Sequence, residues 1–150
     1  MSDIVARISN NIIEAEIVEN IFDIHIEGAV VTTASSSTVS KVAGQTLSGH
    51  RAVCVKSDGK VYYADADTPS CKSVLGITTH SAAINETVAV QTTGQLSNVG
   101  GWSFTPGALV FVGENGQIVS TPVGTAFFSN VGLAVSSDTI NIEVQPTILF

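Results

Sequence analysis

The chain has 150 residues, of which 44% are hydrophobic and only 13% are charged, and its formal net charge is −7. This composition excludes a disordered acidic tail or linker, because such segments are rich in charge and poor in apolar residues. Six Lys and Arg residues cannot form the basic face that phosphate binding requires, so we expect no nucleic-acid partner.

The sequence contains no uninterrupted apolar run of about 18 residues, so we expect no membrane span. The N-terminus, Met1-Ser2-Asp3-Ile4, lacks the basic start and apolar core of a secretory signal. We therefore expect the protein to be made in the cytoplasm and to leave it only as part of a larger particle.

Residues 4–27 contain a nine-residue repeat in which apolar and mostly polar positions alternate. The apolar positions of its three copies are Ile4, Ala6 and Ile8, then Ile13, Ala15 and Ile17, then Phe22, Ile24 and Ile26. Alternation with a period of two is typical of a half-buried strand, and Asn-containing turns separate the copies. The repeat predicts a short β-meander arm over residues 1–31.

A meander of this size is not stable by itself, so its apolar side has to be buried. It could pack on the rest of the chain as an ordinary sheet. We favour an anchor or oligomerisation module, whose apolar stripe is buried between subunits or against a partner. The residues of this anchor stripe are Ile4, Ile8, Ile13, Ile17, Phe22, Ile24 and Ile26.

Residues 32–41 are small, rich in Ser and Thr, and uncharged before Lys41, which predicts a flexible or extended connector. From residue 42 to residue 150, short strands alternate with turn signals every eight to twelve residues. The strands are expected over residues 50–56, 60–65, 72–78, 87–93, 108–112, 117–121, 126–135 in two pieces, and 139–144. This pattern predicts an all-β domain, an antiparallel β-sandwich or small β-barrel.

Residues that could carry chemistry are sparse, and we expect no enzyme, no cofactor and no metal site. His25, His50 and His80 lie far apart in the sequence, with no second ligand type at metal spacing. Asp65 and Asp67 place two carboxylates on one side of an extended segment, as acid/base pairs and calcium sites do, but we interpret them as turn residues before Thr68-Pro69.

Two cysteines, Cys54 and Cys71, are too few for a disulfide-rich secreted scaffold. They could form one bridge, but we favour two buried free thiols. Cys54 is flanked by valines with no histidine nearby, so we expect it to be unreactive.

The loop of residues 100–107 contains Trp102 and Phe104 among glycines and a proline. An exposed aromatic pair in such a loop could contact a glycan or dock a partner. The alternative, which we favour, is that both side chains close one end of the barrel.

The main domain contains a series of strand-and-turn segments in a fixed order. Among them are Gly44-Gln45-Thr46-Leu47-Ser48, Asp58-Gly59-Lys60-Val61-Tyr62, Val74-Leu75-Gly76-Ile77, Trp102-Ser103-Phe104-Thr105-Pro106-Gly107 and Ile142-Glu143-Val144-Gln145-Pro146. In this order, over roughly residues 43–149, the segments resemble the small β-rich domain of tailed-bacteriophage capsid cement, head-decoration or head-fibre proteins. The N-terminal part looks like the alternating apolar arms that precede such domains in some head-fibre and tail-associated proteins.

The resemblance implies a structural protein of the virion that binds and stabilises the assembled capsid. Its expected partners are copies of itself, most simply as a trimer, and the major capsid protein or other virion proteins. Two alternatives stay open: a neck or tail structural protein that carries fibres, and a carbohydrate-binding module that uses Trp102 and Phe104 for host adsorption.

Overall fold

The computed structural model describes residues 5–9, 12–16 and 35–150, and the chain divides into two compact units, residues 1–33 and 34–150. In the first unit, β1 (Val5–Ser9) and β2 (Ile12–Glu16) form an antiparallel hairpin. Ile8 pairs with Ile13 in this hairpin. The third expected strand of the arm lies outside the described residues.

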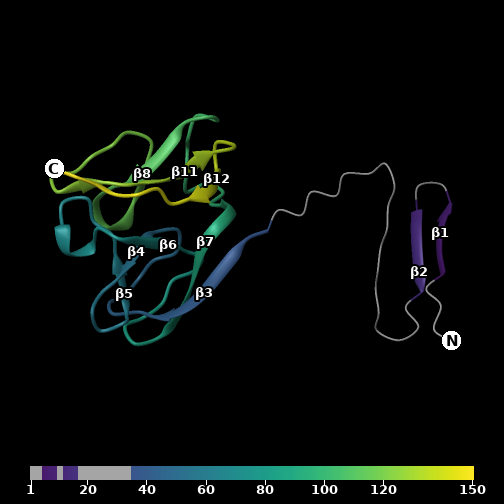
Figure 1. The fold of residues 1–150 in the computed structure, drawn as a ribbon, viewed down its shortest axis with the longest axis horizontal. Coiled ribbons are helices and arrows are strands. Elements are labelled where there is room, and N and C mark those ends of the chain that lie inside the picture. The colour runs from purple at the N-terminus through teal and green to yellow at the C-terminus, as the bar shows by residue number, and fades with distance from the viewer. Residues whose placement is uncertain (1–4, 10–11, 17–34) are drawn as a thin grey trace. The chain divides into compact units, whose positions relative to one another are not determined.

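The second unit consists of β-strands and two 3-10 turns, which confirms the prediction of an all-β antiparallel fold (Figure 1). Its strands are β3 (Ser37–Val42), β4 (Ala52–Val55), β5 (Val61–Tyr63), β6 (Val74–Thr78), β7 (Thr87–Ser97), β8 (Leu109–Val112), β9 (Ile118–Val119), β10 (Phe127–Phe128), β11 (Asn130–Ala134), β12 (Thr139–Glu143) and β13 (Ile148–Leu149). The 3-10 turns are η1 (Pro69–Cys71) and η2 (Glu114–Gly116). No helix among the described residues combines the length and hydropathy needed to cross a membrane.

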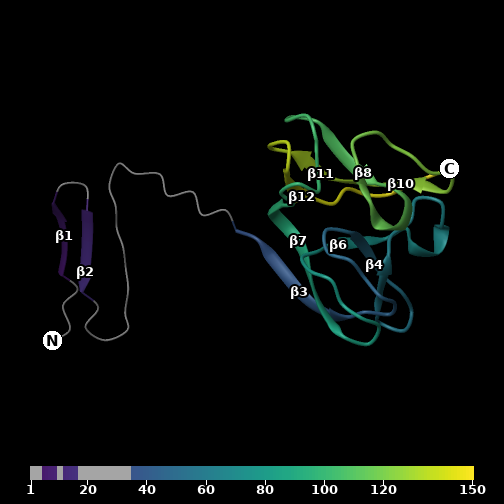
Figure 2. The ribbon, with the colours of Figure 1, turned by 180° about the vertical axis from the view of Figure 1, so that it is seen from behind.

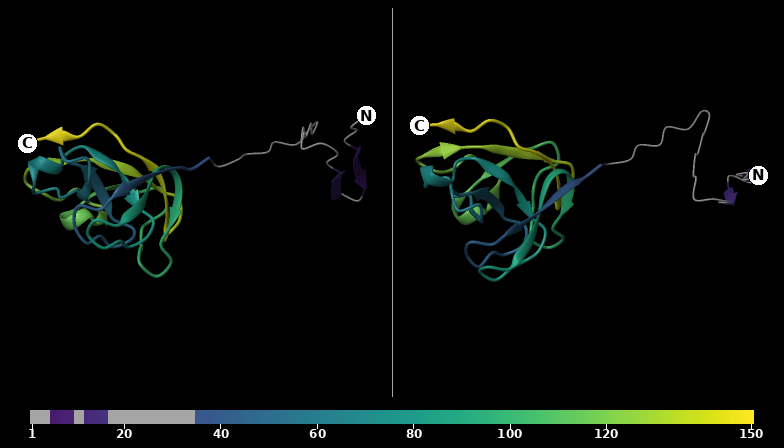
Figure 3. Two further views of the ribbon diagram at one scale, coloured as in Figure 1. Left: turned by 90° about the horizontal axis from the view of Figure 1, so that it is seen from below. Right: turned by 60° about the horizontal axis from the view of Figure 1, so that its bottom comes forward.

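Within residues 35–150, nine strands form one curled antiparallel sheet that makes a half-barrel. The strand order is β5-β4-β6-β7-β12-β11-β8-β9, with β3 added on β7. In Figures 1 and 2, β8, β11 and β12 form one half of this unit, and β3, β4, β5 and β6 form the other. Strands β10 and β13 make a second small sheet, which Figure 3 shows at the C-terminal end of the unit.

Strand β7 belongs to both halves because it changes neighbours along its length. Residues 87–93 pair with β3, Val90 and Gln91 also pair with β6, and residues 93–97 pair with β12. Gly94 stands at this change with a φ of +89°, a conformation that residues with a side chain rarely adopt. Glycine at this position lets β7 pass from one half of the sheet into the other.

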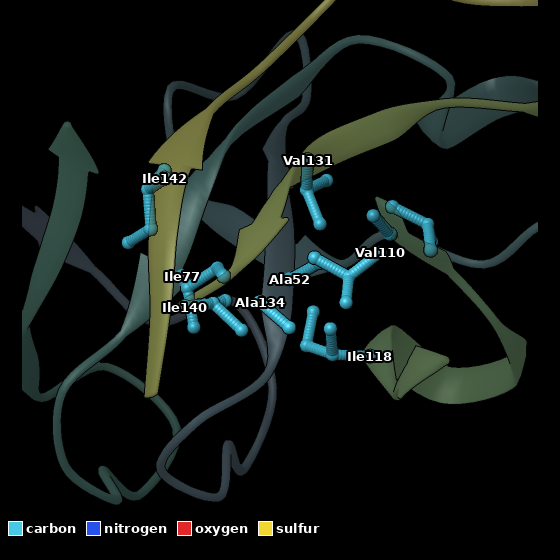
Figure 4. Packing of buried hydrophobic residues seen from close by; sticks show 10 residues of the cluster. Ala52, Ile77, Val110, Ile118, Val131, Ala134, Ile140 and Ile142 are labelled. Atoms are coloured by element: carbon cyan, nitrogen blue, oxygen red, sulfur yellow. The ribbon is translucent and has the colours of Figure 1, made fainter. Parts of the chain in front are cut away.

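The core of the half-barrel has two clusters of buried apolar side chains. The larger cluster contains Ala52, Ala64, Ile77, Val110, Val112, Ile118, Val131, Ala134, Ile140 and Ile142, which Figure 4 shows converging from several strands. The smaller cluster contains Ala43, Leu47, Val53, Val61, Ala82, Val88 and Val90. Each fully buried Val, Leu or Ile contributes about 1.5–3 kcal/mol, so these clusters stabilise the curl of the sheet.

The expected connector over residues 32–41 differs from the structure in its second half. Ser37–Val42 is strand β3, which pairs with β7 from Val42 opposite Thr87 to Ser37 opposite Thr93. The residues of β3 are half-buried or exposed, so their Ser and Thr side chains reach solvent while the backbone is hydrogen-bonded to β7. A polar strand that pairs through its backbone can have the same Ser- and Thr-rich composition as a linker. For this reason the composition of residues 32–41 predicts a connector where the structure has part of a strand.

The prediction of two free thiols is wrong, because Cys54 and Cys71 form a disulfide bond. Both residues are buried, and their Cα atoms are 5.5 Å apart, a typical separation for bridged cysteines. Cys54 lies in β4, whereas Cys71 ends η1, after β5 has turned back along β4. The bridge depends on this return of the chain, which the spacing of two cysteines does not reveal.

Candidate functional site

The outer face of strands β8 and β11 is apolar, although the inner face of the same strands already supplies the core. Val110 and Val112 of β8 are buried, while Leu109 is 54% exposed and Phe111 is half-buried. Leu133 of β11 pairs with Leu109 and is 40% exposed. An antiparallel strand that only covers a core carries polar residues on its outer side, so this second apolar side is available for another contact.

A groove of about 480 Å³ lies on this side of the sheet. It is lined by Leu109, Phe111, Phe128, Asn130, Gly132, Leu133, Glu143 and Gln145. Glu143, at the end of β12, is the charged member of this lining. The groove can therefore bury an apolar partner surface while leaving few charges to desolvate.

A row of aromatic rings continues the groove toward the second sheet. The ring centroids of Phe111 and Phe128 are 6.3 Å apart in an edge-to-face arrangement, and those of Phe128 and Phe150 are 5.6 Å apart. Ile148 and Leu149 of β13 are each about half exposed, and Phe150 is 72% exposed. Ile148 lies opposite Phe128, whereas Leu149 lies opposite the buried Phe127. We define the apolar face as Leu109, Phe111, Phe128, Leu133, Ile148 and Phe150.

The predicted anchor stripe is only partly within the described residues. Ile8 and Ile13 are paired across the β1–β2 hairpin. The other five residues, Ile4, Ile17, Phe22, Ile24 and Ile26, lie outside the described residues. Burial of the stripe between subunits or against a partner therefore stays a prediction.

Trp102 and Phe104 are half-buried and pack against the larger core cluster, with ring centroids 5.7 Å apart. That both side chains close one end of the barrel stays a prediction, because this packing shows only that they contact the core. Trp102 also lines a cleft beside His50, but Phe104 does not line it. The two aromatic residues of the loop thus have different surroundings.

Asp65 and Asp67 act as turn residues, as the sequence interpretation expected. A carboxylate oxygen of Asp65 accepts a hydrogen bond of 3.0 Å from the backbone N–H of Asp67. Asp67 in turn accepts hydrogen bonds from the backbone N–H and the hydroxyl of Thr125, at 2.8 and 2.9 Å. Within the described ranges, no group of three His, Cys, Asp or Glu residues is arranged to hold a metal ion.

The apolar face was missed by the sequence interpretation, although the sequence contains a signal for it. Residues 108–112, Ala-Leu-Val-Phe-Val, form an uninterrupted apolar run rather than an alternating one. Such a run is typical of a strand that is covered on both sides. The structure shows that one of these sides is the core and the other is exposed.

The comparisons with known proteins add no family to these observations. The sequence matches no protein-family model, and a search of curated proteins finds no significant match.

Proposed function

We propose that this chain is a non-enzymatic structural protein of a tailed-phage virion, which binds the assembled capsid and stabilises it. The observation that carries the proposal is the apolar face on β8, β11 and β13. Large contiguous exposed apolar patches often mark protein interaction surfaces. The resemblance of residues 43–149 to capsid cement and decoration domains supplies the partner class.

The charge distribution supports a contact that is driven by apolar burial. Six carboxylates and one arginine in residues 1–34 carry −5 of the formal charge of −7, which leaves −2 for residues 35–150. The lysines of this unit, Lys41, Lys56, Lys60 and Lys72, do not line the groove. The apolar face can therefore approach the capsid surface without bringing unpaired cations or many carboxylates into the contact.

The proposed assembly is a homotrimer in which each copy presents its apolar face to the capsid. Symmetric homo-oligomers are the commonest assemblies, and several copies acting together bind more tightly than one. The anchor stripe of residues 4–26 would hold the copies together in this proposal.

The experiment uses particles that lack this chain and measures its attachment by co-sedimentation. The test variant is Leu109→Ser/Leu133→Ser, and the control is Ile84→Ser, an exposed isoleucine outside the apolar face. Only about half of each leucine is left to bury, so losing it removes about 0.7–1.5 kcal/mol for each, and attachment of the double variant should weaken about tenfold or more. If the double variant has the same unfolding temperature as the native chain and still attaches equally well, the proposal is refuted.

A further inference from the structure

The second feature of the surface is a polar cleft of about 450 Å³ on residues that the proposed function does not use. Two loops form its walls, the segment of residues 48–51 that precedes β4 and the segment of residues 98–102 that follows β7. Gln117, directly before β9, also lines the cleft. The volume lies within the range of about 300–1,000 Å³ that is usual for small-molecule sites.

The first loop holds His50 in an unusual backbone conformation, with a φ of +59°. Hydrogen bonds fix this conformation. The backbone N–H of His50 donates to the carbonyl of Thr78 at 2.7 Å, and the buried hydroxyl of Thr78 donates to the carbonyl of Ser48 at 2.8 Å. Tyr63 accepts a further hydrogen bond from the N–H of Ser48 at 2.7 Å. Strained residues that their surroundings over-determine cluster at ligand sites.

The second loop is fixed in the same way and places Trp102 against His50. The backbone N–H groups of Gly101 and Trp102 both donate to the carbonyl of Asn98, at 3.0 and 3.1 Å. The N–H of Asn98 donates to the carbonyl of Asp138 at 2.8 Å, which ties this loop to the turn before β12. The rings of His50 and Trp102 meet edge to face, with centroids 5.5 Å apart. The cleft is therefore formed before any ligand arrives.

The polar side chains of the cleft are free to bind a ligand. Among the hydrogen bonds within residues 35–150, Arg51 uses only its backbone, and so do His50, Asn98 and Gln117. Among residues 35–150, the lining of the cleft includes the cation Arg51 and no carboxylate. The cleft thus combines one indole, one cation and two amide side chains.

We infer that this cleft binds an acidic saccharide, a pyranose sugar that carries a carboxylate. The planar fork of an arginine matches a carboxylate with two parallel hydrogen bonds. The amides of Asn98 and Gln117 can both donate to and accept from sugar hydroxyls. Trp102 offers a rigid apolar surface with a polar N–H for the C–H face of the ring.

The test titrates the full chain with saccharide probes and measures binding by calorimetry and by tryptophan fluorescence. The fluorescence reports on the cleft because Trp102 is the single tryptophan. The probes are 3′-sialyllactose against neutral lactose, and tri-galacturonic acid against the same oligomer with its carboxyls methyl-esterified. At least one acidic probe should bind with a dissociation constant of about 1 mM or below and about tenfold more tightly than its neutral counterpart. Absence of saturation by both acidic probes, or equal binding of acidic and neutral probes, would overturn the inference.

Substitutions of residues inside and outside the cleft test whether the saccharide binds there. Arg51→Gln should remove the tenfold preference for the acidic probe, whereas Lys72→Gln, which changes a cation outside the cleft, should retain it. Trp102→Ala should weaken binding of every probe by about tenfold or more. Because Trp102 also packs on the core, Gln117→Ala serves as the second variant if the first unfolds. Retention of the full preference in Arg51→Gln would contradict the assignment.

The inference stands independently of the proposed virion role. Arg51→Gln should leave attachment to particles unchanged, and Leu109→Ser/Leu133→Ser should leave sugar binding unchanged. Each activity can therefore fail without the other.

Discussion

Cys54 and Cys71 are joined across strand β4 and the 3-10 turn η1, so a disulfide bond closes a loop that contains the whole of strand β5. The two residues are 17 positions apart and only 1% and 2% exposed. The β4–β5 hairpin is thereby held covalently as well as by its backbone hydrogen bonds.

Removing this bridge should lower the free energy of unfolding. For a loop of this length, the loss of constraint on the unfolded chain amounts to about 3 kcal/mol. The measurement is urea unfolding of the native chain and of the Cys54→Ala/Cys71→Ala variant, each with and without a reducing agent. The reductant should destabilise the native chain and leave the variant unchanged, and equal unfolding of all four samples would contradict the bridge.

Asp58 and Tyr62 form a second link within the same hairpin, because the hydroxyl of Tyr62 donates a hydrogen bond of 2.7 Å to the carboxylate of Asp58. This bond lowers the pKa of Asp58, aided by the backbone N–H of Lys60, and it raises the pKa of Tyr62. Asp58→Asn should therefore bring the pKa of Tyr62 back toward about 10, measured by NMR titration of labelled tyrosine. An unchanged titration of Tyr62 in this variant would exclude the link.

The same link gives stability a defined pH dependence. The contribution of Asp58 is present above its ordinary pKa of about 4 and is lost as the pH falls through its lowered folded-state pKa. The contribution of Tyr62 is present below about pH 10 and is lost as the pH rises through its raised folded-state pKa. Asp58 is exposed and Tyr62 is half-buried, so we expect small effects at the two ends of the pH range. In Tyr62→Phe the alkaline effect should vanish and the acid effect should shrink, because the backbone N–H of Lys60 still lowers the pKa of Asp58.

Gly76 permits the close approach of strands β6 and β7. A Cβ at this position would overlap the carbonyl oxygen of Gln91, which belongs to the neighbouring backbone and cannot move aside easily. Gly76→Ala should lower the free energy of unfolding by about 1–3 kcal/mol, as overpacking generally does. The control is Ser73→Ala at a nearby exposed position, and equal unfolding midpoints for the two variants would contradict this role.

The strands could be predicted from the sequence wherever local alternation and turn residues were decisive. The expected strand over residues 139–144 is β12 (Thr139–Glu143), in which Ile140 and Ile142 are buried. The turn-forming residues Gly113-Glu114-Asn115-Gly116 contain the 3-10 turn η2 (Glu114–Gly116), where Asn115 and Gly116 have positive φ angles. Both features have a clear signal in neighbouring residues of the sequence.

The features that were missed depend on contacts between distant segments. Strand β3 is defined by its pairing with β7, about 50 residues later, and its own residues resemble a linker. The polar cleft was not predicted from the sequence for the same reason. The cleft brings residues 48–51 beside residues 98–102, and no spacing in the sequence reports that proximity.

Removing residues 1–33 tests whether the second unit, residues 34–150, folds without the first. Residues 34–150 contain both core clusters and the disulfide bond, so the shortened chain should fold and unfold at nearly the normal temperature. It should lose the trimer and attach to particles more weakly, because single copies lack the gain from multivalent binding. Light scattering measures the mass, and a trimer of the shortened chain would show that the N-terminal unit does not hold the copies together.

The most direct test of the proposed virion role is a density map of the intact particle that contains this chain. We predict density for residues 35–150 on the capsid, at hundreds of copies in total, as expected for a decoration protein on a symmetric shell. Leu109 and Leu133 should lie at the contact with the capsid, and Lys41 and Lys60 should face away from it. A particle with only about three to eighteen copies at the neck or tail, or with the apolar face open to solvent, would contradict the proposal.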